Sequence, residues 1–151
     1  MPLLNEILSP ERIMVLEESN QKEMVEKLLT MIKGSPLIKN FDTIKDAIWE
    51  REKIISTGIG LELAIPHTRR EDIKGFIASA VLVKKGVDWK AIDDKLVKFA
   101  ILVCSPSDSH KQYLKLLAQT VLLWKDDYKR KKILESNDPF QIYNILKELN
   151  F

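Results

Sequence analysis

Residues Val97–Cys104 read VKFAILVC, an almost unbroken apolar run that predicts a strand buried on both faces of a sheet. The polar stretch Ser105–Ser109 follows it and favours a turn that caps the start of a long helix. That helix is predicted by apolar residues at helical spacing, namely Tyr113, Leu114, Leu116, Leu117, Val121 and Trp124. A buried strand that leads into such a helix is typical of the α/β fold class.

Three segments on the amino-terminal side of this run also have strand patterns. One is rich in β-branched residues, one alternates along its length, and one is continuously apolar: Glu11–Glu17, Leu61–Ile65 and Phe76–Val83. Residues 57–60 (TGIG) predict a loop before the second of these, and residues 84–86 (KKG) predict a turn that ends the third. Residues 89–95 predict a hairpin-type connection through Asp93 and Asp94.

Helices are predicted between and after these strands. They are expected from an Asn20 cap to Gly34, from near Asp42 or Thr43 to residues 56–58, over Lys129–Glu135, and from the cap pair Asp138-Pro139 to Leu149. Interleaved helices and strands favour a single α/β domain over residues 1–151, with a mixed sheet between helical layers.

The composition argues against several classes of partner and site. Positive and negative side chains nearly cancel at a formal net charge of +2, which disfavours nucleic acid and anionic membranes as partners. Cys104 is the only cysteine, so it forms no intramolecular disulfide, and no Cys/His spacing supplies the ligands of a zinc site. The first residues lack the basic and apolar regions of a signal peptide, and the longest apolar runs are too short to cross a membrane. We therefore expect a cytoplasmic protein without membrane insertion.

The sequence Ala64-Ile65-Pro66-His67 ends the alternating strand pattern with one of only two histidines in the chain. Proline fixes its own φ and cannot donate to a sheet, so Pro66 is expected to stop the strand and to direct His67 out of the ladder. Gly58 and Gly60 permit close backbone approach and could expose amides to a phosphate. The alternative is a structural histidine whose ring bonds to a backbone group.

Two motifs, together with their spacing, carry a family resemblance. Arg51-Glu52, then Ser56–Gly60 (STGIG) and Ala64–His67 (AIPH), closely resemble the phosphorylation-site region of the fructose/mannitol/nitrogen-regulatory class of enzyme IIA domains. These domains belong to the bacterial phosphoenolpyruvate-dependent sugar phosphotransferase system. Further similarity at Val87–Trp89 and Leu114–Ala118 extends the resemblance over nearly the whole chain.

The resemblance implies a three-layer α/β/α sandwich with a mixed sheet and a phosphoryl-carrier activity without a metal or organic cofactor. It implies that His67 accepts a phosphoryl group from the phosphocarrier HPr on Nε2 and passes it to an enzyme IIB partner during sugar uptake. Neutral imidazole suits this role because it offers a lone pair near physiological pH. By the same resemblance Arg51 binds phosphoryl oxygens, for which a guanidinium is well shaped. Thr57 is either a hydroxyl donor to the phosphate or a residue that caps the loop.

Members of the family usually carry a second histidine near the start of the long helix. Alignment on Leu114–Ala118 places the expected position at Tyr113, whereas His110 lies three residues earlier. Residues three apart share a helix face, so His110 is a candidate for the second histidine. In the other interpretation Tyr113 fills the pocket and His110 is a surface residue.

Two interpretations other than sugar uptake stay open. In one, the chain is a regulatory module of the nitrogen-regulatory type, and phosphorylation of His67 controls its binding to targets. In the other, it is a non-phosphorylated interaction domain similar to the cytoplasmic domains of anion transporters. The presence of Pro66-His67 and Arg51 counts against the second.

Overall fold

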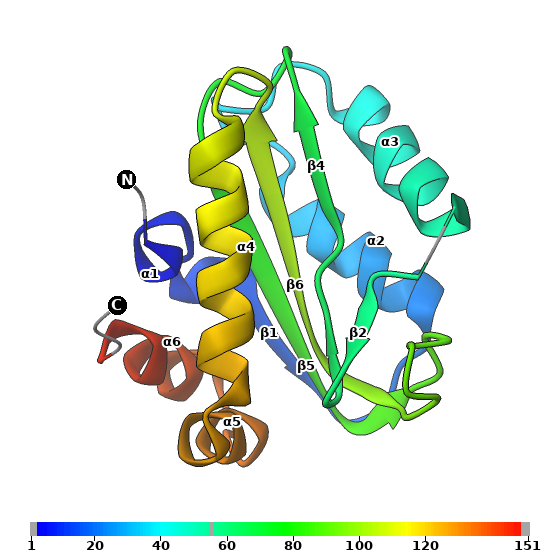
Figure 1. Cartoon of the computed structure of the whole chain (residues 1–151), viewed down its shortest axis with the longest axis vertical. Coiled ribbons are helices and arrows are strands. Elements are labelled where there is room, and N and C mark those ends of the chain that lie inside the picture. The colour runs from blue at the N-terminus through cyan, green and yellow to red at the C-terminus, as the bar shows by residue number, and fades with distance from the viewer. Residues whose placement is uncertain (1–2, 55, 149–151) are drawn as a thin grey trace.

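The computed structural model describes residues 3–54 and 56–148, which form a mixed β-sheet with helices on both faces (Figure 1). Within these residues the sheet has six strands: β1 (Ile13–Leu16), β2 (Gly58–Gly60), β3 (Leu63–Ala64), β4 (His67–Arg70), β5 (Ile77–Val87) and β6 (Val97–Pro106). The helices are α1 (Leu4–Ile7), α2 (Gln21–Ile32), α3 (Phe41–Ile54), α4 (His110–Lys125), α5 (Asp127–Leu134) and α6 (Pro139–Lys147), and a 3-10 turn at Pro10–Arg12 precedes β1.

The strand order is β1-β5-β6-β3-β2. β3 and β4 both pair with β6, β3 near its start and β4 near its end. β1 is parallel to β5, β5 is antiparallel to β6, and β3 and β4 are both parallel to β6. β3 pairs through Leu63 with Phe99, and β4 pairs through His67 with Val103. This arrangement confirms the predicted mixed sheet.

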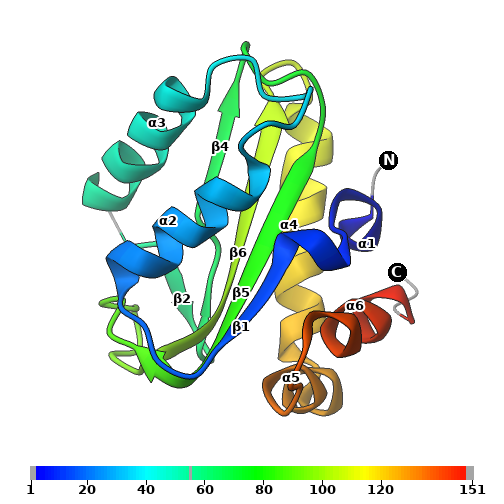
Figure 2. The same ribbon diagram turned by 180° about the vertical axis from the view of Figure 1, so that it is seen from behind.

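Side chains that alternate along β5 and β6 divide the core into two clusters. Phe99, Ile101 and Val103 of β6 point to the face covered by α1, α4, α5 and α6. The intervening Ala100, Leu102 and Cys104 point to the face covered by α2 and α3 (Figure 2). Since both faces of these strands are buried, continuous apolar runs are the expected pattern. The three-layer α/β/α sandwich implied by the family resemblance is therefore confirmed.

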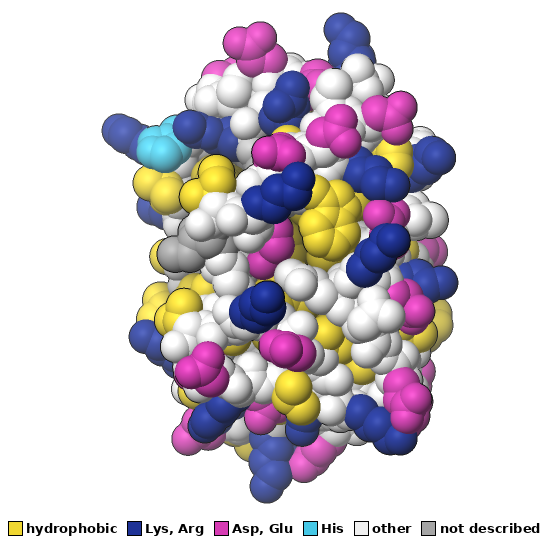
Figure 3. Space-filling model, turned by 90° about the vertical axis from the view of Figure 1, so that its right-hand side faces the viewer, with side chains coloured by type: hydrophobic (Ala, Val, Ile, Leu, Met, Phe, Trp, Pro, Cys, Tyr) yellow, Lys and Arg dark blue, Asp and Glu magenta, His cyan; other side chains and the backbone are white. Residues whose placement is uncertain are grey.

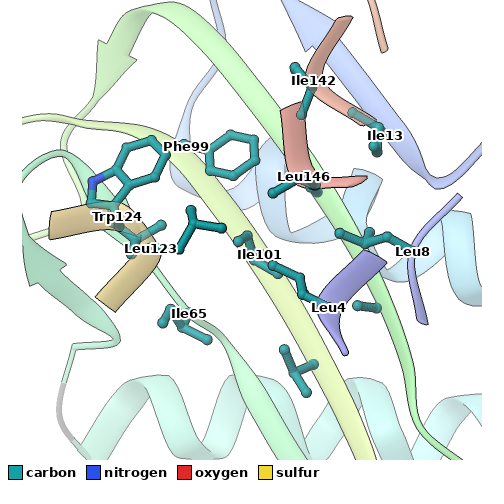
Figure 4. Packing of buried hydrophobic residues seen from close by; sticks show 14 of the residues in the cluster. Leu4, Leu8, Ile13, Ile65, Phe99, Ile101, Leu123, Trp124, Ile142 and Leu146 are labelled. Carbon is teal, nitrogen blue, oxygen red and sulfur yellow. The ribbon is translucent and has the colours of Figure 1, made fainter. Parts of the chain in front are cut away.

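The cluster beneath α4 shows how closely the layers pack (Figure 4). The rings of Phe99 on β6 and Trp124 on α4 stack with their centroids 5.2 Å apart and 6° between their planes. Leu4 and Leu8 at the amino-terminal end meet Ile142 and Leu146 of α6 in the same cluster. The first and last helices are thereby joined to one core.

Two of the predicted helix caps are confirmed, whereas Ser109 at the start of α4 makes no capping hydrogen bond through its side chain. The side chain of Asn20 accepts a hydrogen bond from the Glu23 amide, and that of Asp138 accepts one from Gln141 at the start of α6. α3 begins at Phe41, one residue before Asp42, the earlier of the two predicted starts. Leu149, the predicted end of the last helix, lies outside the described residues.

The prediction of a loop at residues 57–60 followed by a strand at Leu61–Ile65 is wrong. Residues Gly58–Gly60 form β2, which pairs with β3 in an antiparallel hairpin. Leu61 and Glu62 make the turn, with φ of 55° and 69°. Left-handed backbone at both positions is typical of tight hairpin turns, which normally contain glycine or asparagine. The alternating pattern was misleading because Leu61 lies in the turn and is 44% exposed.

Two further boundaries differ from the prediction. The Lys84–Gly86 stretch does not end its strand, because β5 continues to Val87 through a change of register opposite β6. The amino group of Lys84 donates to the carbonyl oxygens of Leu134 and Ser136, which ties this part of β5 to the end of α5. The predicted strand Glu11–Glu17 is shortened to β1, because residues 10–12 form the 3-10 turn.

Candidate functional site

His67 is the first residue of β4, at the point where Pro66 interrupts the edge of the sheet. Pro66 has no amide proton, but its carbonyl oxygen still accepts a hydrogen bond from the Val103 amide at 3.0 Å. The backbone therefore remains hydrogen-bonded to β6 between the end of β3 and the start of β4. This confirms that the proline separates the strand from the histidine, although His67 begins a new strand instead of leaving the sheet.

The imidazole of His67 is held by its own backbone neighbourhood. Its Nδ1 lies 2.6 Å from the carbonyl oxygen of Ile65, and a carbonyl oxygen can only accept, so Nδ1 carries the proton. In the neutral ring Nε2 then has the free lone pair. The family resemblance implies reaction on Nε2, and this contact selects the tautomer whose lone pair is on that nitrogen.

The environment of His67 favours its neutral form. Burial lowers the pKa of the imidazole, and the positive charge of Arg51 lowers it further, although the Ile65 carbonyl and the Glu52 carboxylate act in the opposite direction. The net shift is downward. At neutral pH the ring is therefore uncharged and its Nε2 lone pair is available for a nucleophilic step.

Tyr113 on α4 lies against His67. The two ring centroids are 5.8 Å apart with an angle of 55° between the planes, and Tyr113 is only 7% exposed. Burial and the nearby Cys104 raise the pKa of the Tyr113 hydroxyl, whereas the charges of Arg69 and Arg51 lower it, with a net upward shift. Tyr113 thus contributes a protonated phenol and an aromatic wall beside His67.

His110 is exposed at the first residue of α4, about one helical turn before Tyr113. Of the two rings considered for the second-histidine position, the one that the structure places against His67 is Tyr113. The role of His110 as a second histidine stays a prediction.

Arg51 lies half-buried in the last turn of α3, and its charge acts on both His67 and Tyr113. α3 is tied to β4 through Asp72. This carboxylate accepts from the Thr43 hydroxyl at 2.7 Å and from Arg70 Nε at 3.0 Å. The helix that carries Arg51 and the strand that carries His67 are thereby fixed relative to each other.

Glu52, next to Arg51, gathers the hydrogen bonds that hold the following loop. Its carboxylate accepts from the Thr57 amide at 3.0 Å, from the Thr57 hydroxyl at 2.6 Å and from the indole of Trp89 at 2.9 Å. Thr57 is buried and its hydroxyl proton is directed to Glu52. Of the two roles considered for Thr57, this arrangement matches the one that caps the loop.

Gly58 and Gly60 are used for close packing in this structure. A Cβ on Gly58 would lie 2.8 Å from the Cβ of Ala91, and the Gly58 amide donates to the Ser56 hydroxyl. Gly60 has a φ of +97°, and a Cβ there would meet the carboxylate of Asp93 at 3.3 Å. Both glycines face the β5–β6 connection, and their predicted contribution to a phosphate pocket stays a prediction.

Two features of this site were not assigned from the sequence. Glu52 was visible in the Arg51-Glu52 motif, but its role depends on Trp89, which lies 37 residues away. Arg69 follows His67 by two residues on β4, and its Cζ lies 6.0 Å from the centre of the Tyr113 ring. Its signal was the spacing of two in a strand, which places both side chains on one face of the sheet.

The described residues give little support for a metal site, a membrane-spanning helix or a large surface patch of one charge. Within residues 3–54 and 56–148, no group of three His, Cys, Asp or Glu side chains is arranged to hold a metal ion. None of the helices in these ranges has both the length and the apolar character of a membrane-spanning segment. Figure 3 shows basic and acidic side chains interspersed on the side where α3 lies, so that face has no large patch of one charge.

Known proteins resemble this chain in sequence and in fold. The chain is 24% identical over 144 residues to a fructose-specific EIIA component of a phosphotransferase system from Haloferax volcanii, covering 94% of each chain. It is 25% identical over 146 residues to a nitrogen regulatory protein from Bradyrhizobium diazoefficiens, covering 97% of this chain and 95% of that protein. The crystal structure of nitrogen regulatory protein IIA-Ntr from Neisseria meningitidis has the same fold, with a TM-score of 0.85 at 23% identity over 95% of this chain and 98% of that one.

The family model described as "Phosphoenolpyruvate-dependent sugar phosphotransferase system, EIIA 2" matches residues 6–149. This range contains the whole sheet and every side chain of the candidate site. The chain therefore belongs to the EIIA 2 family of the phosphoenolpyruvate-dependent sugar phosphotransferase system, a family of phosphoryl carriers.

Proposed function

We propose that this protein is a phosphotransferase of the fructose/mannitol class that accepts a phosphoryl group from phospho-HPr on Nε2 of His67 and passes it to an enzyme IIB domain. The observation that carries the proposal is the 2.6 Å contact between His67 Nδ1 and the Ile65 carbonyl oxygen. Because Nδ1 holds the proton, the nucleophilic lone pair is on Nε2, the nitrogen remote from the backbone. Membership of the EIIA 2 family supports the same role.

The transfer requires one nucleophilic displacement in each direction. The Nε2 lone pair attacks phosphorus, an N–P bond forms, and the bond between phosphorus and the donor histidine breaks with its electron pair returning to that donor. In the second step an acceptor thiolate of the IIB domain attacks, and the N–P electron pair returns to His67. Such transfer depends on in-line positioning and on compensation of the charge on the phosphoryl oxygens. The fixed ring of His67 supports the first requirement, and Arg51 is proposed to meet part of the second.

Phosphorylation by the purified general components tests the proposal. With phosphoenolpyruvate, enzyme I and HPr, the wild-type protein is expected to acquire one acid-labile phosphate. His67→Gln is expected to acquire none while keeping its circular dichroism and its melting temperature within a few degrees. His110→Gln serves as the matched control, because it removes the only other histidine and should leave the labelled site in place. Normal labelling of His67→Gln would refute the assignment.

A second candidate is a regulatory IIA protein whose phosphorylation state controls its binding to targets. It is favoured by the similarity to a nitrogen regulatory protein over 95% of that protein's length. The two functions differ in the fate of the phosphate. Transfer from phospho-His67 to purified IIB domains of the fructose and mannitol type is expected for the uptake function. Absence of transfer to every IIB domain tested, with normal labelling by HPr, would favour regulation.

A further inference from the structure

A second guanidinium lies close to the ring of His67. His67 and Arg69 are separated by two residues on β4, where they pair with Val103 and Ser105 of β6. Side chains at this spacing point to the same face of a strand, which here is the face covered by α4. The ring of Tyr113 on α4 meets both, with 5.8 Å between its centroid and that of His67 and 6.0 Å between its centroid and Arg69 Cζ.

Arg69 differs from its neighbour Arg70 in what it binds. Arg70 points to the other face of the sheet and forms an ion pair with Asp72 at 3.0 Å. Within the described part of the chain, Arg69 forms no ion pair with a carboxylate, and its side chain is exposed. Its recorded contact is the aromatic ring of Tyr113, which supports a cation without neutralising it. The charge of Arg69 is therefore available to an anion.

A phosphoryl group on His67 would be stabilised by a positive charge of this kind. A phosphoryl group brings about two negative charges to the imidazole near neutral pH, and the ring is half-buried. The positive charges of Arg51 on α3 and of Arg69 on β4 both act to lower the pKa of Tyr113, the residue that lies against His67.

We propose that Arg69 is a second phosphoryl-binding guanidinium, which is held on the face of Tyr113 and donates hydrogen bonds to the oxygens of the phosphoryl group on His67. The proposal rests on the proposed function, in which His67 Nε2 is the acceptor. Arg69 stabilises the developing charge on the phosphoryl oxygens while the N–P bond to His67 forms and the N–P bond of the donor breaks. It takes no proton in this step, since a guanidinium stays protonated throughout.

A small phosphodonor separates phosphoryl binding from protein docking. Phosphoramidate can phosphorylate an accessible imidazole, with ammonia as the leaving group, without contacting the protein surface that a carrier protein would need. We expect Arg69→Ala to lower the initial rate of His67 phosphorylation by about tenfold or more with phosphoramidate, as the loss of a charge-assisted hydrogen bond to a transition state predicts. Phospho-HPr is expected to give a similar factor, and Arg69→Lys to recover part of the rate.

Lys85→Gln is the control, because it removes one positive charge from an exposed side chain far from His67. Lys85 lies on β5, seven residues beyond Ala78, which pairs with the Val103 that His67 also pairs with. We expect its phosphoramidate rate to stay within about twofold of the wild type, since a charge at this distance is screened. Melting temperatures of all variants should be compared, and that of Arg69→Ala is expected to match the wild type because the side chain is exposed.

The outcomes discriminate between the proposals. If Arg69→Ala reacts normally with phosphoramidate and slowly with phospho-HPr, Arg69 contacts the protein donor and the phosphoryl-binding role is refuted. Normal rates with both donors refute it as well. If wild-type His67 is phosphorylated by neither donor, the proposed function itself fails. That result differs from the first two because the wild type, not the variant, is then unreactive.

Discussion

The indole Nε1–H of Trp89 donates to Glu52 Oε1 at 2.9 Å and thereby links the β5–β6 connection to the last turn of α3. The same carboxylate binds the amide and the hydroxyl of Thr57, so one side chain joins a helix end, a hairpin and a long connection. Because Arg51 precedes Glu52, this junction also restricts where the guanidinium of Arg51 can lie. Glu52, Thr57 and Trp89 thus act together to hold the loop that follows α3.

Glu52→Gln tests this junction. The substitution replaces one acceptor oxygen by an amide that faces donors, so at least one bond from Thr57 or Trp89 is lost. We expect the free energy of unfolding to fall by about 1–3 kcal/mol, measured by urea denaturation. Glu50→Gln on the same helix is the control, because Glu50 is exposed and pairs with the exposed Lys53, and it should change stability by less than about 0.5 kcal/mol. Equal effects would show that the junction does not stabilise the fold.

Glu62→Gly is expected to stabilise the protein. Glu62 has a φ of 69° in the β2–β3 turn, where glycine is relaxed and other residues are strained. Its Oε2 is buried without a hydrogen bond and lies 3.5 Å from Lys98 Nζ, so little is lost with the side chain. We expect an increase of about 0.5–1 kcal/mol in the free energy of unfolding.

Glu18→Gly provides the comparison for this turn. Glu18 is likewise a glutamate paired with a lysine, Lys85, but its φ is not positive. Glycine there adds freedom to the unfolded chain without relieving strain, so a small loss of stability is expected. If both variants lose stability, the left-handed turn is not under strain.

The buried imidazole predicts a specific pH dependence of stability. The pKa of His67 is lowered in the folded state, chiefly by burial, whereas an unfolded histidine titrates near about 6.5. Below that pH the unfolded state binds more protons, so the contribution of His67 to stability is lost as the pH falls through 6.5 toward the folded pKa. The stability of the wild type relative to His67→Gln should therefore decrease between pH 7.5 and pH 5, as measured by urea denaturation. An increase over this range would mean that the pKa is raised.

Asp72→Ala tests the connection between α3 and β4. Burial raises the pKa of Asp72, but bonds from Thr43 and Arg70 outweigh it, and the pKa lies below its ordinary value. Loss of both bonds should cost about 1–2 kcal/mol near pH 7. The difference from the wild type should shrink as the pH falls through the folded pKa, since protonation weakens the same bonds. Asp46→Ala, an exposed position on α3, should show neither effect.

Much of the fold follows from local sequence patterns. β5 and β6 are continuous apolar runs because both of their faces are buried, and Asn20 and Asp138 cap their helices through their own side chains. The β2–β3 hairpin could not be predicted in this way. Its turn depends on distant partners, since Trp124 Nε1 donates to the Leu61 carbonyl oxygen and the Ile92 amide donates to that of Gly58. Such contacts leave no periodic signal in the hairpin itself.

In the candidate site, too, some residues are identified by local sequence motifs and others only by contacts between distant segments. His67 and Arg51 stand out because short motifs surround them, and Pro66 gives a local reason for the placement of the histidine. Tyr113 and Arg69 meet across α4 and β4, so their relationship to His67 is set by the packing of a helix on a sheet. The sequence could name Tyr113 as one of two possibilities, but only the packed structure places its ring beside His67.

The most direct test is to identify which ring nitrogen carries the phosphate. Protein labelled with ¹⁵N-histidine is phosphorylated by phospho-HPr and examined by ¹⁵N and ³¹P NMR. The contact between His67 Nδ1 and the Ile65 carbonyl predicts a one-bond coupling of phosphorus to Nε2 of His67, with Nδ1 still protonated. Coupling to Nδ1 of His67, or to either nitrogen of His110, would contradict the account.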